Sequence, residues 1–277
     1  MLIPAAVADY VASLPHPAGL VGCRAGGVSH DCCEYDIAVF GKGNNTVVQA
    51  GGHVIELVHV GMADAAALGR VYVIKDSPAF ALSSMLQDVA PKQKKALAAS
   101  GRKSLVSSLF CQQKMKGARQ QVAAAMWLKM AAYHFVQGTL ALAGARPMPL
   151  HELAQVRQAE LSTDAADSVQ AALECIGAER AGRPAIARSI EAVSELKAGD
   201  YDRDLMRHKA EHLLEKSMIA DCYYYLGRVA AESLAGKNSA FYSKYGKLVQ
   251  LSMDLSNDTQ QLEKLQKSLF RAAKKGL

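Results

Sequence analysis

Glycines and carboxylates near the start of the chain follow a pattern suited to phosphate and metal binding. Gly26 and Gly27 precede a short polar loop containing Ser29, and Glu34 and Asp36 then enter an apolar strand. Because glycine has no Cβ, its backbone can approach a polyphosphate closely, and a carboxylate that follows can hold Mg²⁺ against that phosphate. This segment therefore predicts a site for a phosphate and a divalent cation.

A third acid lies on the next predicted strand. Glu56 stands in the middle of the apolar run at residues 53–60, where a charged side chain is costly unless it is paired or bound to a metal. Acids on neighbouring strands can share one cation. We therefore expect Glu56 to meet the acids of residues 34 and 36 at one ion.

This order of glycine pair, loop, strand acid and further acid resembles the DNA polymerase β-like nucleotidyltransferase superfamily, over about the first third of the chain. The resemblance implies an enzyme that binds a nucleoside triphosphate and transfers the nucleotidyl group to an acceptor hydroxyl, with Mg²⁺ (or Mn²⁺) held by three carboxylates. Gly26 and Gly27 match the glycine pair, Asp36 a metal-binding acid and Glu56 the third acid. Ser29 is close enough in sequence to offer its hydroxyl to a phosphate.

The family places acid-x-acid at the start of the strand, so that both side chains share one face. If Asp36 is the first acid, Ala38 takes the second position and one metal ligand is missing. If Glu34 and Asp36 form the pair, all three acids are present, although Glu replaces the commoner Asp. We favour the second register, in which the catalytic and metal-binding residues are Glu34, Asp36 and Glu56. The first describes a catalytically degenerate protein that binds nucleotide or nucleic acid without turnover.

The chain as a whole predicts an α+β protein: a small mixed-sheet, nucleotidyltransferase-like domain over residues 1–90 and an all-α helical bundle over residues 91–277. A first helix is expected over residues 4–19. Strands are expected at residues 20–25, 35–40, 46–49, 53–60 and 71–74. Asn44 and Asn45 between apolar runs indicate a hairpin turn. After residue 78 the composition favours helix, with breaks that delimit about six helices.

Charge differs between the two predicted domains. There are 7 Lys and Arg against 8 Asp and Glu up to residue 95, and 25 against 18 beyond it. The segment 262–275 forms a basic amphipathic helix, which could contact nucleic-acid phosphates or simply be the solvated face of a bundle helix. We expect the helical domain to select the acceptor, with nucleic acid as one candidate partner.

Other patterns carry less information. The six cysteines show no Cys-x-x-Cys spacing, so reduced thiols are expected. The most apolar window, residues 122–145, contains Lys129, His134 and Gln137, which disfavours a membrane span. No secretory signal is visible, and a cytoplasmic protein is expected. His208 and His212 match a zinc-protease spacing, but their charge-rich surroundings favour a solvated helix face.

Overall fold

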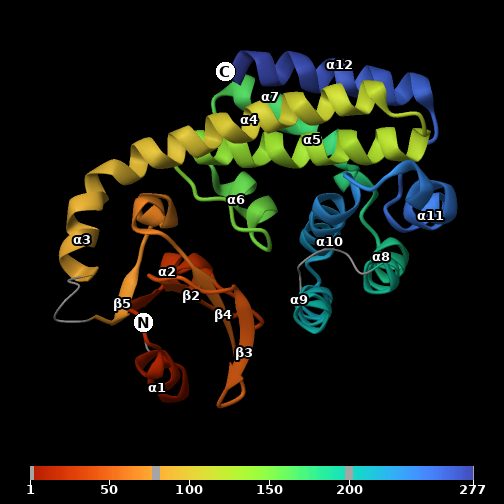
Figure 1. The fold of residues 1–277 in the computed structure, drawn as a ribbon. Helices are drawn as coiled ribbons and strands as arrows, with labels where there is room; N and C mark the ends of the chain where they lie inside the picture. Colours follow the sequence, from red (N-terminus) through yellow and green to blue (C-terminus); the bar gives the residue numbers. More distant parts are fainter. Residues whose placement is uncertain (1–2, 77–81, 197–201, 277) are drawn as a thin grey trace. The chain divides into compact units, whose positions relative to one another are not determined.

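The computed structural model describes residues 3–76, 82–196 and 202–276 of the 277-residue chain. The protein has the predicted α+β class: a five-stranded mixed sheet is followed by a helical region (Figure 1). Contacts divide the chain into two compact units, residues 1–98 and 99–277, whereas the sequence suggested a division after residue 90. Each unit is described by itself.

The first unit is built on five strands. They are β1 (Ala18–Leu20), β2 (Tyr35–Val39), β3 (Thr46–Ala50), β4 (His53–His59) and β5 (Tyr72–Lys75). Their order in the sheet is β3-β4-β2-β1-β5. Strands β2 and β4 are parallel, and the other neighbours are antiparallel. The central parallel pair is therefore the place where side chains of two strands lie side by side in register.

The only tight hairpin among these strands joins β3 to β4. Gly51 and Gly52 form its two-residue turn, and both have positive φ angles, 56° and 78°. Glycine adopts this backbone without strain, and it matches the twist of the flanking strands. The hairpin predicted at Asn44 and Asn45 is wrong, because β3 pairs with β4 and not with β2.

Helices and apolar side chains cover both faces of the sheet. Helix α1 (Ala5–Ser13) buries Val7 and Val11 in a core with Ile37 and Ile55. On the other face, the 3₁₀ helix η1 (Met62–Leu68) and helix α3 (Leu82–Val89) pack against Ala38. Successive residues of β2 thus point to opposite layers, as strand geometry requires.

Two predicted elements end earlier than expected or differ in type. The first helix stops at Ser13 rather than residue 19, because Leu14 precedes a proline and is extended, with ψ 150°. The segment predicted as a strand over residues 20–25 is mostly helix α2 (Gly22–Gly26). Gly22 has a φ of 70°, which ends the extended backbone of β1 and lets the chain turn into this short helix.

The second unit is helical. Its elements are α4 (Gln93–Gly117, which begins in the first unit), α5 (Gln121–Leu142), α6 (Glu152–Gln158), α7 (Thr163–Ile176), η3 (Ala178–Arg180), α8 (Arg183–Glu195), α9 (Arg203–Glu215), α10 (Ile219–Leu234), α11 (Ser239–Ser252) and α12 (Thr259–Gly276). Ser162, Asp202 and Asn238 cap three of these helices through side-chain oxygens. None of the described helices combines the length and apolar composition that crossing a lipid bilayer requires.

Helix α5 lies at the centre of this unit. Thirteen of its residues are buried, and it packs against α7, α10, α11 and α12. It crosses α4 closely at Gly101 and Gly138, where a Cβ on Gly138 would lie 2.9 Å from the Gly101 carbonyl oxygen. Figure 1 shows α4, α5, α7 and α12 running alongside one another. The long apolar window at residues 122–145 is thus the core helix of a bundle.

Candidate functional site

The structure brings the three predicted acids together. Asp36 of β2 and Glu56 of β4 are direct partners in the parallel register, so their side chains lie side by side. Glu34 precedes β2 by one residue and shares the face of Asp36 because strand residues alternate. One carboxylate oxygen from each of the three lies within 4.8 Å of the others, and all three residues are half-buried.

This geometry favours the register that pairs Glu34 with Asp36. Ala38, the alternative partner, is fully buried and packs with the apolar layer of η1 and α3. The acid at residue 34 therefore supplies the carboxylate that Ala38 lacks. The convergence of the three side chains is observed, and metal binding by them stays a prediction.

The donor set fits a hard divalent cation. Mg²⁺ takes oxygen ligands at about 2.0–2.1 Å, so ligands on opposite sides of one ion are about 4 Å apart. The spacing of the Glu34, Asp36 and Glu56 oxygens is close to that range. Three carboxylates at this distance also repel one another, and a bound cation offsets the repulsion. Carboxylate ligands suit Mg²⁺ or Mn²⁺ better than they suit softer metals.

Gly22 is a site residue that the sequence prediction missed. A Cβ built on it would lie 1.8 Å from Asp36 Oδ2, so only glycine leaves room for that carboxylate. Its φ of 70° also favours glycine. The signal in the sequence is a glycine directly after the apolar Leu20 and Val21, in a segment whose composition predicts a strand over residues 20–25.

The predicted glycine pair lies at the other end of α2. Gly26 is the last residue of this helix, and Gly27 is its C-cap with a φ of 76°. Nothing lies within 4 Å of a Cβ built on Gly27, and Ser29 is exposed in the loop that follows. The glycine in contact with the acids is therefore Gly22. Phosphate binding by Gly26, Gly27 and Ser29 stays a prediction.

Arg24 positions the loop that carries the first acid. Its Nε donates hydrogen bonds to the carbonyl oxygens of Cys33 and Glu34, each at 3.1 Å, and its guanidinium also donates to Asp31 O. The guanidinium carbon lies 4.2 Å from the centre of the Tyr35 ring. These contacts fasten the loop to α2 and fix the backbone from which the Glu34 side chain projects. Sequence reasoning gave Arg24 no role.

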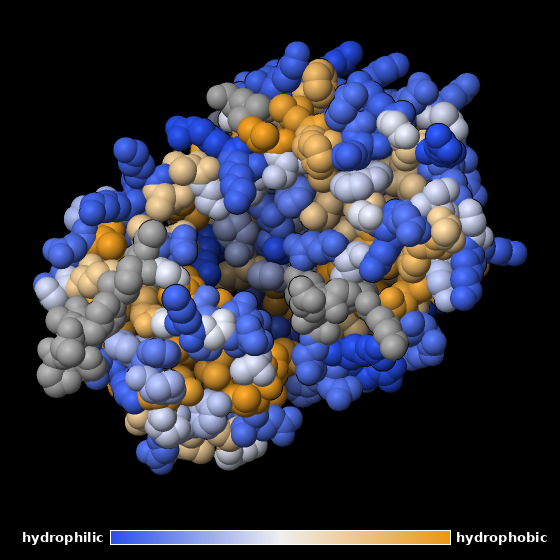
Figure 2. All heavy atoms as spheres, in the orientation of Figure 1, coloured by the Kyte–Doolittle hydropathy of each residue, from blue (hydrophilic) through white to orange (hydrophobic). Residues whose placement is uncertain are grey.

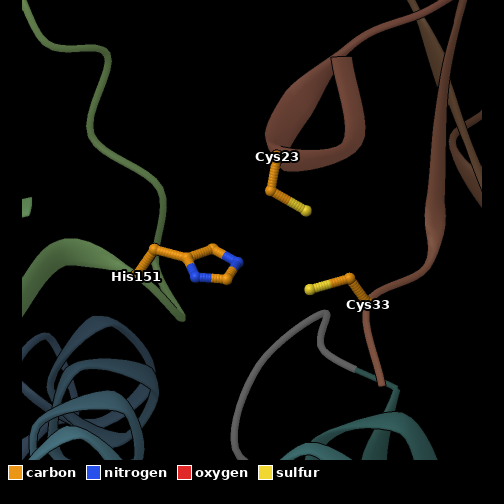
Figure 3. Close-up of side chains that lie close together, drawn as sticks. All are labelled: Cys23, Cys33 and His151. Atoms are coloured by element: carbon orange, nitrogen blue, oxygen red, sulfur yellow. The ribbon is translucent and has the colours of Figure 1, made fainter. Parts of the chain in front are cut away.

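Two buried cysteines lie next to the acids. Cys23 of α2 and Cys33 at the end of the loop point their sulfur atoms toward each other, within 4.8 Å (Figure 3). A hydrogen bond with Cys33, burial, and the negative charges of Asp36 and Glu34 raise the pKa of Cys23. None of the six cysteines, all of which are described, forms a disulfide. His151, also labelled in Figure 3, belongs to the second unit.

The second unit contains buried charges of a different kind. The Glu152 carboxylate is fully buried, accepts a hydrogen bond from Tyr224 at 3.1 Å and forms an ion pair with Arg228. Lys129 is 2% exposed, and its Nζ donates to the Met253 carbonyl oxygen at 3.0 Å. Burial lowers the pKa of Lys129 to about 7. These groups hold helices together inside the bundle.

No protein-family model matches the chain, and comparisons with curated proteins and with solved structures find no match either.

Proposed function

We propose that the chain is a Mg²⁺-dependent nucleotidyltransferase that moves a nucleoside monophosphate from a nucleoside triphosphate to an acceptor hydroxyl. The supporting observation is the convergence of Glu34, Asp36 and Glu56, with oxygen atoms within 4.8 Å, on two parallel strands. Three carboxylates in this arrangement resemble the metal-binding acids of the polymerase β-like superfamily. Gly22 supports the proposal, because it keeps the space beside Asp36 open.

The chain's residues have separate roles in the proposed reaction. Bound Mg²⁺ supplies positive charge that offsets the charge of the triphosphate. Glu34, directly before β2, and Asp36 on β2 would hold that ion together with Glu56 on the neighbouring strand β4. The acceptor hydroxyl would give its proton to the Glu56 carboxylate and attack the α-phosphorus in line. The bond from the α-phosphorus to the bridging oxygen breaks, and pyrophosphate leaves with the electron pair.

The first test replaces Asp36 by Asn, which keeps its size and removes its charge. We expect Mg²⁺-dependent transfer from an α-labelled nucleoside triphosphate to fall by roughly a thousandfold, since one ligand of the charge-neutralising ion is lost. The matched control is Asp31→Asn, an exposed acid of the same loop outside the cluster. Binding of Mn²⁺, followed by its electron paramagnetic resonance signal, gives a readout that needs no acceptor. Unchanged transfer and Mn²⁺ binding in the Asp36 variant would refute the assignment.

A second candidate keeps the site and lacks turnover. The observations that favour it are Ala38 on the strand of the acids and Glu, not Asp, at the first acid position. Such a protein binds nucleotide with Mg²⁺ as a sensor or scaffold. Calorimetry with each of the four nucleoside triphosphates, combined with a pyrophosphate assay, separates the two: binding with release supports the transferase, and binding alone supports the sensor.

A further inference from the structure

The positive charge of the second unit is concentrated on two helices. Residues 99–119, which are the part of α4 in this unit and the two residues after it, and residues 259–276 of α12 contain ten Lys and Arg and one acid, Glu263. Residues 99–277 contain 25 Lys and Arg against 18 Asp and Glu, which leaves 15 against 17 for residues 120–258. The rest of the unit is therefore slightly acidic. A uniformly solvated bundle surface does not explain this distribution.

The two basic helices are joined within the bundle and frame a groove. Gln266 of α12 donates a hydrogen bond to Gln112 of α4 at 3.1 Å, and both side chains are buried. Beside this contact, the end of α4, the start of α5 and α12 enclose a groove of about 630 Å³. We name it the α4–α12 groove. Figure 2 shows hydrophilic side chains projecting along the outer edge of α12.

Four cationic side chains line the α4–α12 groove: one from α4, one from the segment directly after it and two from α12. They are Lys116, Arg119, Lys267 and Arg271. All four are exposed, and within the described part of the chain none of them forms an ion pair. The lining contains a single carboxylate, that of Glu263. The groove therefore presents unneutralised positive charge to an anionic ligand.

An aromatic ring lies among these cations. Phe270 of α12 lines the groove and is half-buried. Lys116 Nζ lies 5.6 Å and Lys274 Nζ 4.9 Å from the centre of its ring. A ring with cations nearby combines base stacking with phosphate binding, which is how single-stranded nucleic acids are bound without sequence preference.

We propose that the α4–α12 groove binds a single-stranded nucleic acid, with phosphates on Lys116, Arg119, Lys267 and Arg271 and a base stacked on Phe270. The groove volume falls within the range of roughly 300–1,000 Å³ typical of small-ligand pockets, which suits one or two unpaired nucleotides and not a duplex. This binding does not depend on the transferase activity. If both hold, the bound strand is the acceptor.

An anionic membrane is the other polyanion that a basic amphipathic helix can meet. That use requires the apolar face of the helix to enter the lipid. In α12 this face is already buried: Leu262, Leu269 and Ala273 are at most 5% exposed and pack in the bundle. The cations of α12 are therefore accessible to a polyanion in solution, whereas its apolar side chains cannot enter a lipid bilayer.

The test measures binding of the full chain to three fluorescein-labelled probes: a 20-nucleotide RNA strand, its DNA equivalent and the RNA duplex. Binding is measured by fluorescence anisotropy at several salt concentrations. In Lys267→Gln/Arg271→Gln we expect about tenfold weaker binding of the single strand, and a salt slope smaller by about 1.4 because two phosphate contacts are lost. The control Lys216→Gln/Lys237→Gln removes the same charge from exposed positions elsewhere. Equal losses in both double variants would overturn the proposal.

A second variant tests the stacking ring. Phe270→Leu should weaken single-strand binding at least about fivefold and leave the salt slope unchanged, because an uncharged contact is lost. Phe270→Tyr keeps a ring and should restore binding, which excludes a simple folding defect. The proposal fails if the duplex binds as tightly as the single strand while Phe270→Leu has no effect, or if phosphatidylserine vesicles bind with the same charge dependence. Asp36→Asn should still bind the strand, so failure here and failure of the transferase proposal are distinguishable.

Discussion

The two units place carboxylates in opposite surroundings. In the helical unit, Glu152 is fully buried, and its oxygens are satisfied by the Arg228 guanidinium and the Tyr224 hydroxyl. In the sheet unit, three half-buried carboxylates converge on one another within 4.8 Å. The charge of a carboxylate paired inside a core is already compensated without a ligand. A convergent group of like charges is stabilised by a bound cation, which offsets the mutual repulsion. The difference is between a buried charge that holds the fold together and a group of like charges for which we propose metal binding.

The largest effect is expected when the Arg228 cation is removed from its buried ion pair with Glu152 in the helical unit. Arg228→Met leaves the Glu152 carboxylate buried without its ion-pair partner, and should lower the free energy of unfolding by about 3–5 kcal/mol in urea denaturation. Arg207→Met is the control, because its ion pair with Glu191 is exposed and should contribute less than about 1 kcal/mol.

A double variant shows whether the loss comes from the stranded charge. Glu152→Gln/Arg228→Met removes both charges and should recover most of the stability lost in Arg228→Met, because residue 152 no longer carries a buried, unpaired charge. If Arg228→Met and Arg207→Met have equally small effects, the buried pair does not hold the fold, and the contrast between the units is lost.

Much of the sheet unit could be predicted from its sequence, because local patterns decide it. The apolar runs around Asp36 and Glu56 gave two of the strands nearly to the residue. Alternation along β2 placed the acids of residues 34 and 36 on one face, and the parallel register completed the group. The mistaken hairpin at Asn44 and Asn45 has the opposite origin. Gly51 and Gly52 mark the turn that joins β3 to β4. The parallel pairing of β2 with β4, and not with β3, is decided by long-range packing, and no turn residue marks it.

The parts that were missed have weak or ambiguous sequence signals. Helix α2 has five residues, too few for a helical period to show, so Gly22 was placed within a strand. After residue 78, ten α-helices (α3–α12) are described where about six were expected. Two of the unexpected breaks contain Ser217 and Asp254, which adopt positive φ angles of 58° and 49°. Residues other than glycine rarely adopt this left-handed backbone, so a serine or an aspartate does not lead one to expect a helix end. The glycine or proline that usually marks such a break in a sequence is not at these two positions.

The next largest effect is expected from Gly22, and it tests whether the acid group needs its present geometry. In Gly22→Ala the new Cβ would fall 1.8 Å from Asp36 Oδ2, so the carboxylate must move. We expect roughly hundredfold slower nucleotidyl transfer and at least tenfold weaker Mn²⁺ binding, since displacements of this size at a catalytic group are costly.

Gly52→Ala is the matched control for backbone strain. Gly52 has a φ of 78°, close to that of Gly22, but nothing lies within 4 Å of a Cβ built there. Each variant should lose about 1 kcal/mol of stability, because alanine is strained in this conformation. Only Gly22→Ala should affect Mn²⁺ binding and transfer. If both variants keep full activity, the space beside Asp36 has no functional role.

The smallest expected effect concerns Lys129, a buried cation that, unlike Arg228, has no ion-pair partner in the described part of the chain. Among the described residues, its Nζ donates to the Met253 carbonyl oxygen and the Tyr223 hydroxyl. Burial, helped by the charge of Arg180, lowers the pKa of Lys129 to about 7, although Asp254 and Glu179 oppose the shift. In an unfolded chain a lysine titrates near 10.4.

The sign of the pH dependence follows from these two values. Below pH 7 the lysine is charged in both states, and its burial costs the folded state in full. Between about pH 7 and 10 the unfolded chain binds one more proton, so stability rises with pH, by at most about 1.4 kcal/mol per unit. Urea denaturation of wild type and Lys129→Met at pH 7, 8 and 9 isolates this contribution, because other titrating groups cancel in the difference. Stability should rise with pH in wild type relative to the variant. A difference that stays constant with pH would show that Lys129 keeps its proton in the folded state, and that an uncompensated charge is tolerated in the bundle core.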